Sequence, residues 1–463
     1  MFNKIGQEDI KVFETIFGKE KCFSGTEIES EYAKDEMGTI ISYPEIRVIA
    51  DNKYQISELM QYANQKRIPV TVRGAGTGLV GGCVATRGGV LLDLTEMNQI
   101  IELDQINMTL RAQPGVLMLD IYDFVEKENL FYGPDPGEKT ATIGGTIATN
   151  AGGMRAIKYG TTREWIRGLE VVLPSGEIIK TGGKVVKNSS GYPLKELFIG
   201  TEGTLGIIVE ATLKLTSLPK FSTSLLAPFE TSIKAIEAAP ELIKRHVTPT
   251  AVEYVDQTSL KYSNEFLGKH MPHDNYDAYL LLSYDGTSKE ALDADITLAS
   301  QLCLELGAID VYLIDTEERK DSVWTIRGAF LEAIKASTTE MDEIDVVLPR
   351  SKIASYLEFT QDISKKLNLR MPYFGHVGDG NLHIYFCRDD LKEDVWQQKL
   401  KEAFDVMYDR AFANGGLVSG EHGIGYAKKA YLEKQIGATQ IKLMREIKKI
   451  FDPNNILNPD KIV

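Results

Sequence analysis

Cysteine is scarce in this chain, and the positions of the few cysteines argue against one class of redox centre. The 463 residues contain four cysteines, at positions 22, 83, 303 and 387, and no two of them form a Cys-x-x-Cys pair. Scattered cysteines of this kind argue against iron–sulfur ligation within the chain. They are typical of a protein that works in a reducing cytoplasm.

Long apolar runs and an excess of positive charge are also missing. No uninterrupted apolar stretch is long enough for a membrane span, and the N-terminal residues lack the apolar core of a signal peptide. The formal net charge of −14 argues against a nucleic-acid partner, which would require a basic face. We therefore expect a cytoplasmic protein, and the length predicts two or three domains with ample core.

Histidine is scarce too, and three of the six histidines gather in two short segments. These segments are residues 376–383 (HVGDGNLH) and residues 419–425 (SGEHGIG). Asp379-Gly380 predicts a two-residue hairpin turn, because glycine accepts the positive φ that such turns need. The turn would create three cross-strand pairs: Gly378 with Asn381, Val377 with Leu382, and His376 with His383.

Opposed positions on one strand face would bring the two imidazoles together. Directly opposed Cβ atoms lie roughly 4.5–5.5 Å apart, which suits two imidazoles that bind one metal ion. Glu421 can complete a His-His-carboxylate set with His376 and His383, which suits Zn, Mn or Fe(II) and leaves positions open for a substrate oxygen. His422 would then serve as a proton acceptor. The alternative interpretation is two surface histidines on an ordinary hairpin.

Two glycine-rich stretches predict a second site. Residues 73–82 (RGAGTGLVGG) follow the predicted strand 68–72 and contain five glycines. Glycine accepts left-handed backbone and lets amide N–H groups point at an anion, so this stretch is a candidate pyrophosphate cradle. Residues 142–153 (TIGGTIATNAGG) are mostly small, so their backbone can approach a flat ligand closely. The alternative is a turn-rich β domain that binds nothing, but two such stretches in one domain argue against it.

The alternation of apolar segments predicts an α+β fold. One apolar helical face is expected from Ile56, Leu59, Met60 and Ala63. The predicted parts follow the chain in order: helices over 1–42, a β-α-β-β region over 43–100, antiparallel strands over 101–218, an α+β region with an antiparallel sheet over 219–405, and helices over 406–463 that are interrupted at 415–425.

A resemblance to a known family rests on six motifs, at residues 73–82, 143–153, 200–206, 376–383, 420–425 and 451–460. The first three resemble the FAD-binding domain of the vanillyl-alcohol-oxidase superfamily. The others are similar to its FAD-linked D-2-hydroxyacid dehydrogenase branch, the family of D-lactate dehydrogenases and the glycolate oxidase flavin subunit. The resemblance covers nearly the whole chain from about Ser42 onward. The closing motif of the family usually ends in Gly-Lys, whereas this chain has Asp460-Lys461.

The resemblance implies a domain plan and a cofactor. It implies an N-terminal helical segment over 1–42, a two-subdomain PCMH-type FAD-binding domain over 43–218, a substrate-binding α+β cap over 219–405, and a C-terminal helical segment over 406–463 that completes the active site. Noncovalent FAD is expected, because neither flavin loop has a histidine, although Cys83 lies just past the first loop. The implied FAD-binding residues are Arg73, Gly74, Ala75, Gly76, Thr77, Gly78, Pro136, Thr142, Gly145, Ala148, Asn150, Gly152, Gly153, Tyr159, Glu202, Gly206, Ile207 and Asn458.

The resemblance also implies an activity, the oxidation of a small D-2-hydroxyacid by hydride transfer to flavin N5. The expected substrate is D-lactate, with glycolate and 2-hydroxyglutarate as alternatives. Arg327 would hold the substrate carboxylate, His422 would accept the hydroxyl proton, and a divalent metal (Zn, Fe or Mn) on His376, His383 and Glu421 would polarise the hydroxyl. Asn381 and Tyr385 are weaker candidates for the lining of the pocket.

The reduced flavin must then pass its electrons on. A separate acceptor is expected, which the resemblance allows to be a quinone, an iron–sulfur subunit or an electron-transfer flavoprotein, with the last favoured. Two rival functions remain at this point: a noncatalytic flavin subunit that only relays electrons, and a non-redox enzyme such as the alkylglycerone-phosphate synthases, which share the expected fold.

Overall fold

The chain passes between two folding units at four points. Unit 1 comprises Met1–Gly152, Thr161–Leu218 and Glu421–Val463, and unit 2 comprises Gly153–Gly160 and Pro219–Gly420. The structure is a computed structural model that describes residues 2–463. The predicted domain boundary at 218/219 is one of the four crossing points. Unit 2 continues past the predicted boundary at residue 405 and ends at Gly420. The N-terminal part of the chain and the C-terminal part from Glu421 onward both belong to unit 1.

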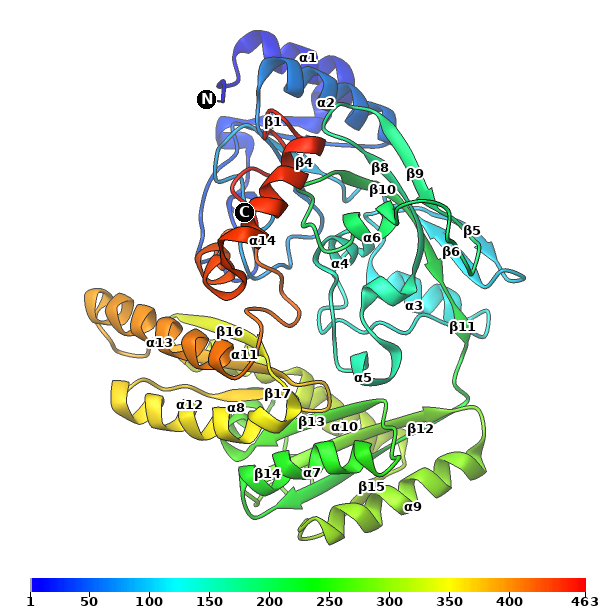
Figure 1. Cartoon of the computed structure of the whole chain (residues 1–463), viewed down its shortest axis with the longest axis vertical. Helices are drawn as coiled ribbons and strands as arrows, with labels where there is room; N and C mark the ends of the chain where they lie inside the picture. Colours follow the sequence, from blue (N-terminus) through cyan, green and yellow to red (C-terminus); the bar gives the residue numbers. More distant parts are fainter. Residues whose placement is uncertain (1) are drawn as a thin grey trace. The chain divides into compact units, whose positions relative to one another are not determined.

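Unit 1 contains two larger sheets (Figure 1). In the first, β2, β4 and β3 are parallel and β1 pairs antiparallel with β2; in the second, the order β5-β6-β10-β8-β9 is antiparallel throughout. The elements of unit 1 are α1 (Gln7–Phe17), β1 (Cys22–Ser24), β2 (Ile46–Ile49), α2 (Lys53–Lys66), β3 (Val70–Arg73), β4 (Val90–Asp93), β5 (Ile100–Asp104), β6 (Thr109–Ala112), α3 (Met118–Glu126), β7 (Leu130–Phe131), α4 (Ile143–Thr149), β8 (Ile166–Val172), β9 (Ile178–Gly182), α6 (Leu194–Phe198), β10 (Ile207–Lys214), β11 (Thr216–Ser217) and α14 (Lys429–Phe451).

The first β-α-β-β region folds as its sequence predicts. Helix α2 begins after Asn52, whose side chain accepts hydrogen bonds from the N–H groups of Tyr54 and Gln55. Its predicted apolar face is confirmed, since Ile56, Leu59, Met60 and Ala63 are all fully buried. That face belongs to the core between α1, α2 and the parallel strands.

The N-terminal segment is less helical than predicted. Within residues 1–42 the structure has one α-helix, α1, followed by short 3₁₀ turns at Lys19–Lys21, Gly25–Glu27 and Ser30–Ala33. Cys22–Ser24 is instead an edge strand that pairs with β2. Three residues carry too weak a periodicity to be recognised as a strand, and the strand is stabilised by contacts distant in sequence, its pairing with β2 and the packing of Cys22 against the core.

Unit 2 is built on one antiparallel sheet of seven strands in the order β15-β12-β14-β13-β17-β18-β16 (Figure 1). The antiparallel sheet predicted for 219–405 is confirmed. The elements of unit 2 are α5 (Ala156–Tyr159), β12 (Phe221–Phe229), α7 (Ser232–Lys244), β13 (Ala251–Asp256), α8 (Gln257–Leu267), β14 (Ala278–Gly286), α9 (Lys289–Glu305), β15 (Tyr312–Ile314), α10 (Glu317–Gly328), α11 (Phe330–Ala336), β16 (Met341–Val347), α12 (Ile353–Leu367), β17 (Tyr373–His376), β18 (Asn381–Cys387) and α13 (Glu393–Ala413).

The two faces of this sheet are covered by different helices. Helices α7 and α9 pack on strands β12 to β14, and α12 and α13 pack beside them. A second apolar cluster joins the opposite face to α8, α10 and α11, with Val255, Phe374 and Tyr385 from the sheet and Ile326 and Phe330 from the helices. Because side chains alternate between the two faces of a sheet, those that point away from α7 and α9 point toward α8, α10 and α11.

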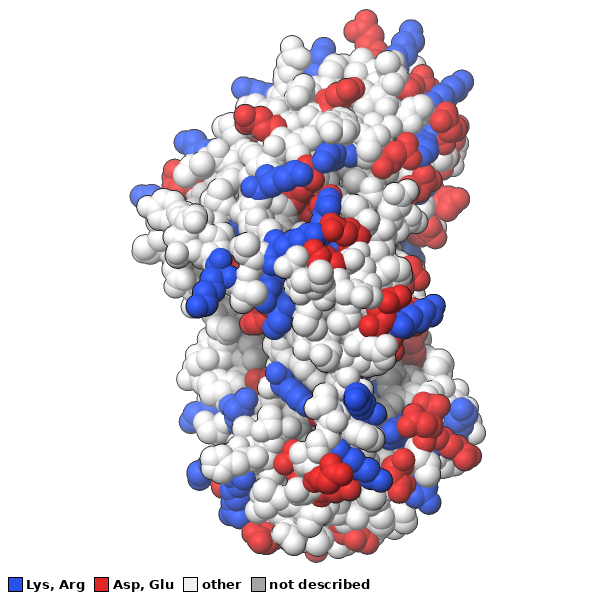
Figure 2. All heavy atoms as spheres, turned by 90° about the vertical axis from the view of Figure 1, so that its right-hand side faces the viewer, with Lys and Arg blue, Asp and Glu red and all other residues white. Residues whose placement is uncertain are grey.

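Surface charges are interspersed. Figure 2 shows acidic and basic side chains next to one another over the face it presents. Charged side chains of unit 1 form ion pairs, such as Arg111 with Glu210 at 2.7 Å and Lys184 with Asp104 at 2.7 Å. None of the helices in the described part of the chain combines the length and the apolar character that a membrane crossing requires.

The C-terminus returns to the first sheet of unit 1. Leu457 forms a parallel bridge with Val70, so the last residues continue the sheet beyond β3. The buried Asn458 accepts a hydrogen bond from the Val72 N–H on Oδ1 at 2.8 Å and donates from Nδ2 to the Glu202 carbonyl at 2.7 Å. Asn458 has φ +41°, a left-handed conformation that asparagine tolerates better than most residues.

Replacing Asn458 tests this tether. Asn458→Ala leaves the Val72 N–H and the Glu202 carbonyl without their partner, and each orphaned buried group costs roughly 1–3 kcal/mol. We expect the free energy of unfolding of unit 1 to fall by at least about 2 kcal/mol, measured as a lower urea midpoint. Asn188→Ala, in an exposed loop, is the control. An unchanged midpoint for Asn458→Ala would contradict the tether.

Candidate active site

The hairpin between the two histidines has a longer turn than predicted. Strands β17 and β18 pair His376 with Asn381 and Phe374 with His383, so the turn comprises the four residues 377–380. The predicted register, with His376 opposite His383, is therefore wrong. The His376 carbonyl accepts hydrogen bonds from the N–H groups of Asp379 and Gly380, and Gly380 has φ +97°. The Asp-Gly signal marked the turn, but it could not fix the number of residues in it.

The shift by two residues keeps both imidazoles on one face. Residues 381 and 383 share a face, and His376 lies opposite residue 381, so the histidines are diagonal neighbours. Their ring centroids are 5.4 Å apart with the planes at 82°. Both side chains are buried, at 6% and 3% exposure. The interpretation as two surface histidines is therefore wrong.

A buried carboxylate and a guanidinium hold His376. Tyr254 of β13 pairs with Gly375, so Glu253 is opposite His376. His376 Nδ1 lies 2.6 Å from Glu253 Oε1, and Arg327 donates to Glu253 Oε2 from Nε at 2.9 Å and from Nη2 at 2.5 Å. Burial opposes the ionisation of Glu253, but His376 and Arg327 outweigh it and hold its pKa below the usual range. An ionised carboxylate only accepts, so Nδ1 of His376 carries the hydrogen.

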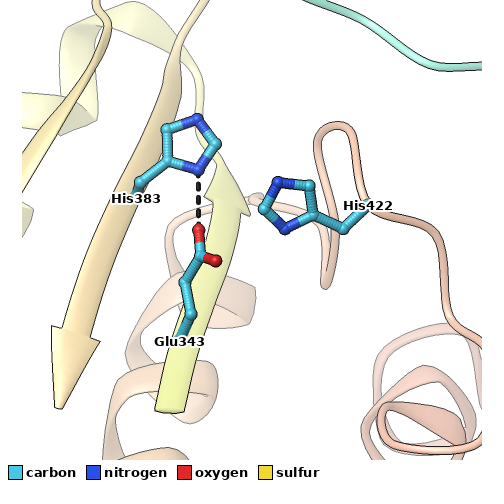
Figure 3. Close-up of side chains that lie close together, drawn as sticks. All are labelled: Glu343, His383 and His422. Atoms are coloured by element: carbon cyan, nitrogen blue, oxygen red, sulfur yellow. Dashed lines mark hydrogen bonds and ion pairs between the residues drawn. The ribbon is translucent and has the colours of Figure 1, made fainter. Parts of the chain in front are cut away.

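A second carboxylate holds His383. His383 Nδ1 lies 2.8 Å from Glu343 Oε1, and both side chains are buried. Figure 3 shows the other ring nitrogen of His383 pointing away from Glu343. Each histidine thus has one nitrogen engaged by an acid from a neighbouring strand.

A third buried acid, Asp345, holds the last residues of unit 2 in place. Asp345, which is opposite His383 on β16, accepts hydrogen bonds from Asn381 Nδ2 at 2.7 Å and from Ser419 Oγ at 2.7 Å. It also accepts from the Gly420 N–H at 3.1 Å. Glu421 follows directly, so Asp345 fixes the point from which Glu421 and His422 emerge.

Two overlapping donor sets result from this local geometry. Possible ligand atoms of His376, His383 and Glu421 all lie within 4.8 Å of one another, and so do those of Glu343, His383 and His422. Figure 3 shows the imidazole of His422 beside His383 and Glu343. Imidazole and carboxylate donors at this spacing fit a divalent ion such as Zn, Mn or Fe(II). The residues predicted as metal ligands therefore fit the group that they were predicted to hold.

Arg327 lies near this cluster, but its fork faces Glu253. Its side chain is 7% exposed, and its guanidinium stands 4.5 Å from the centroid of the Phe374 ring. The expectation that Arg327 binds a substrate carboxylate stays a prediction. In the structure, Nε and Nη2 of Arg327 donate to the carboxylate of Glu253.

The two glycine-rich stretches meet in unit 1. A Cβ on Gly74 would fall on Thr142 Oγ1, well inside van der Waals contact. Thr142 caps helix α4, and its Oγ1 accepts a hydrogen bond from the Gly145 N–H. A Cβ on Gly78 would meet nothing within 4 Å, so that side of the first stretch is open. The close approach of the Gly74 backbone to the Thr142 side chain, beside open space at Gly78, fits the predicted cradle for FAD.

The loop at 200–206 joins the same place. The Glu202 N–H donates to the Ala148 carbonyl at 2.8 Å, and the Gly200 N–H donates to the Ile147 carbonyl at 3.0 Å. The carboxylate of Glu202 accepts hydrogen bonds from the Ile424 and Gly425 N–H groups at 2.7 Å each. Burial raises the pKa of Glu202 to about 7, although these N–H groups act in the opposite direction.

Three predicted FAD-binding side chains contact the chain itself. Arg73 donates from Nη1 to the Lys34 carbonyl at 2.7 Å and is 6% exposed. Asn458 bridges Val72 and Glu202, as described above. The hydroxyl of Tyr159 donates to Asp285 Oδ1 at 2.8 Å, within unit 2. Whether these side chains also contact a cofactor stays a prediction, but their observed role is to hold the loops.

The remaining predicted FAD-binding residues lie in both units. Gly153 begins the short segment that belongs to unit 2 and has φ +140°. A Cβ on Gly152 would lie 2.9 Å from Glu421 Oε1. The others all belong to unit 1: Ala75, Gly76, Thr77, Gly78, Pro136, Asn150, Gly206 and Ile207.

Three residues of the site were missed in the sequence: Glu253, Glu343 and Asp345. A signal for them was present. In residues 341–348 (MDEIDVVL), the acids at 343 and 345 alternate with apolar residues and so share one strand face. Glu253 interrupts the apolar run of residues 251–255 (AVEYV). An acid inside a buried strand needs a hydrogen-bond partner. Here the partners are imidazole and guanidinium for the two glutamates, and an amide, a hydroxyl and a backbone N–H for Asp345.

Two family profiles match the chain. The profile described as FAD binding domain matches residues 44–182, and the one described as FAD linked oxidases, C-terminal domain, matches residues 218–462. The FAD expected from the glycine-rich stretches is thereby supported.

Individual relatives match over almost the whole length. A D-lactate dehydrogenase from Anaerostipes hadrus is 44% identical over 467 residues, covering 100% of this chain and 98% of that protein. The glycolate oxidase subunit GlcD from Bacillus subtilis (strain 168) is 38% identical, covering 93% and 91%. A crystal structure of p-cresol methylhydroxylase with substrate bound matches with a TM-score of 0.82 at 18% identity, covering 100% and 98%. This last likeness shows the fold alone, and with it the predicted α+β architecture is confirmed.

The contact between the glycine-rich stretches gives a test of the cofactor site. Gly74→Val would displace the Thr142 side chain, which a Cβ at position 74 would overlap, and overpacking of this kind typically costs about 1–3 kcal/mol. We expect FAD to bind roughly 5–150-fold more weakly, measured as the flavin retained on ultrafiltration.

The control for this variant is Gly286→Ala. Gly286 lies in unit 2, and a Cβ there would meet nothing within 4 Å. FAD affinity at the wild-type level in Gly74→Val would show that the close approach of the two stretches does not shape the cofactor site.

Proposed function

Because this chain belongs to the family of FAD-linked oxidases, we propose that it oxidises a small D-2-hydroxyacid, with D-lactate to pyruvate as the preferred reaction. The observation that carries the proposal is the donor set of the buried His376 and His383 with the half-buried Glu421, next to His422, in a chain that has an FAD-binding domain. A subunit that only relays electrons would have no use for such a set.

Each group has a distinct part in the proposed chemistry. FAD, when bound, supplies the acceptor for the hydride from the substrate Cα. A divalent cation on His376, His383 and Glu421 supplies Lewis acidity toward the substrate hydroxyl. His422 accepts the proton of that hydroxyl, since a neutral imidazole within reach is a suitable base near neutral pH.

The charges of unit 2 bear on the choice of substrate. Glu253, Glu343 and Asp345 bring three carboxylates to the face that carries the histidines, and Arg327 brings one guanidinium, which Glu253 engages. A second carboxylate on the substrate would approach these like charges, which is unfavourable. We therefore favour a monocarboxylate over 2-hydroxyglutarate. The names of the two relatives support D-lactate first and glycolate second.

We propose that the electrons leave through a separate acceptor protein, with an electron-transfer flavoprotein favoured over a quinone or an iron–sulfur subunit. The support for this choice is the family resemblance of the sequence. The protein is proposed to act in the cytoplasm, on the ground that its scattered cysteines suit a reducing compartment.

Anaerobic flavin bleaching tests the activity. D-lactate added to the FAD-loaded protein should abolish the flavin absorbance band near ~450 nm, because hydride transfer reduces the ring. L-lactate and D-2-hydroxyglutarate are the controls, and both should bleach far more slowly. Flavin that stays oxidised with every small D-2-hydroxyacid would favour an electron-relay subunit instead. Reoxidation by electron-transfer flavoprotein, compared with air, then tests the acceptor.

Removal of the proposed base gives a second test. His422→Ala should lower kcat by about 10²–10⁴-fold, the usual effect of losing a general base, while FAD stays bound. The exposed His246→Ala, outside both candidate sites, is the matched control. Turnover at the wild-type level in His422→Ala would remove this residue from the role of base.

A further inference from the structure

We propose that Glu253 and Glu343 are positioning residues of the metal centre, and that Arg327 acts on that centre through Glu253. This inference rests on the proposed function, since it assumes that His376 and His383 bind a divalent cation. It assigns a role to three charged side chains of unit 2, of which Glu253 and Glu343 contact the two imidazoles and Arg327 contacts Glu253.

The first argument is the tautomer of the imidazole. A neutral histidine has one N–H and one lone pair, and the nitrogen that donates to an acceptor leaves the other for a metal. Glu253 and Glu343 each accept from an Nδ1, at 2.6 Å for His376 and 2.8 Å for His383. Both carboxylates therefore select Nε2 as the ligand atom. The same selection on both rings is what one shared cation requires.

The second argument is how the carboxylates themselves are held. Both belong to strands adjacent to the hairpin: Glu253 lies on β13, next to β17, and Glu343 lies on β16, next to β18. They thus flank the two histidines from the two sides of the β17–β18 hairpin, on the same face of the sheet. Glu253 and Glu343 are 0% and 4% exposed, so water cannot readily replace them as acceptors. The hairpin itself contributes only the rings, and the flanking strands orient them.

The third argument concerns Arg327. Its Nε and Nη2 both donate to Oε2 of Glu253, while Oε1 of the same carboxylate accepts from His376. The guanidinium thus fixes the carboxylate plane, which in turn fixes the imidazole. An arginine that anchored substrate would need its fork turned toward the ligand, but these two donors face Glu253. The geometry makes Arg327 the outer member of a chain that ends at the metal ligand.

Two alternatives have different consequences. Glu343 could be a ligand itself, because it forms a donor set with His383 and His422. Arg327 could bind substrate directly, in which case its loss would affect KM for D-lactate and leave the metal in place. Affinity for metal, measured without substrate or turnover, separates these roles.

The experiment measures Zn²⁺ and Mn²⁺ affinity of the full-length, FAD-loaded protein after chelator treatment. We expect Glu253→Gln and Glu343→Gln to weaken binding by about 10–100-fold each, the usual effect of losing an outer carboxylate partner of a metal-bound histidine. Arg327→Lys should weaken it in the same direction. His383→Ala, which removes a ligand, should weaken it more than any of them.

Asp389→Asn is the matched control. Asp389 also pairs with an arginine of unit 2, Arg370, through Nε at 3.0 Å and Nη2 at 2.5 Å, and it has no part in the histidine cluster. Its φ of +51° is one that asparagine tolerates. This variant should bind metal like the wild type. Should Glu253→Gln fail to fold, Glu343→Gln still tests the claim, because the ion pair of Arg327 is with Glu253 and stays intact in that variant.

Each outcome has a defined meaning. A wild-type protein that binds neither metal removes the metal centre from the proposed function, and this inference falls with it. A wild type that binds metal, with both glutamine variants unchanged, overturns the positioning role and leaves the metal centre standing. Loss in Glu343→Gln as large as in His383→Ala makes Glu343 a ligand. Unchanged metal affinity with a raised KM in Arg327→Lys makes Arg327 a substrate anchor.

Discussion

Two imidazoles buried on one face of an antiparallel sheet must have hydrogen-bond partners, and the neighbouring strands supply them. The cost of burying a polar ring is offset only if its N–H finds an acceptor. Here each acceptor is a carboxylate, Glu253 for His376 and Glu343 for His383, and Arg327 and Asp345 are buried near them. The site is thus a set of mutually dependent charges, in which no member can be replaced by an apolar residue without stranding another.

The same constraint explains why a loop so far along the chain belongs to the site. Asp345 satisfies its oxygens with the side chains of Asn381 and Ser419 and with the Gly420 N–H. A side chain at position 420 would collide with Asn381 and Asp345, so glycine is required there. The carboxylate that stabilises the hairpin therefore also determines where Glu421 and His422 begin.

Much of this arrangement could be predicted from the sequence, for identifiable reasons. Residues 376–383 and 419–425 concentrate rare histidines around glycines, and the small residues of the stretches at 73–82 and 142–153 allow the close approach of backbone to a ligand. The register of the hairpin could not be predicted, because Asp-Gly is compatible with turns of two or four residues and the alternation of faces is the same for both. The acids at 253, 343 and 345 look like ordinary strand residues until the strand order, β13-β17-β18-β16, brings them beside the histidines. Strand order comes from packing of the whole unit, which local patterns do not encode.

The structure also explains why Asp460 can replace the glycine that usually ends the closing motif of the family. Its φ of +65° lies in the left-handed region, where glycine is favoured and aspartate is tolerated.

The return of the C-terminus to β3 sets an order of events during synthesis. The bridge between Val70 and Leu457 and the hydrogen bond between Asn458 and Val72 join residues almost four hundred positions apart, and the hydrogen bond from Asn458 to Glu202 spans 256 positions. Contacts of such long sequence separation form late, because the loop between them must close first. Residues 219–420, by contrast, form one continuous stretch of unit 2. On the ribosome, the seven-stranded sheet can therefore assemble while unit 1 is still incomplete, and the cofactor-binding unit waits for the last residues of the chain to emerge.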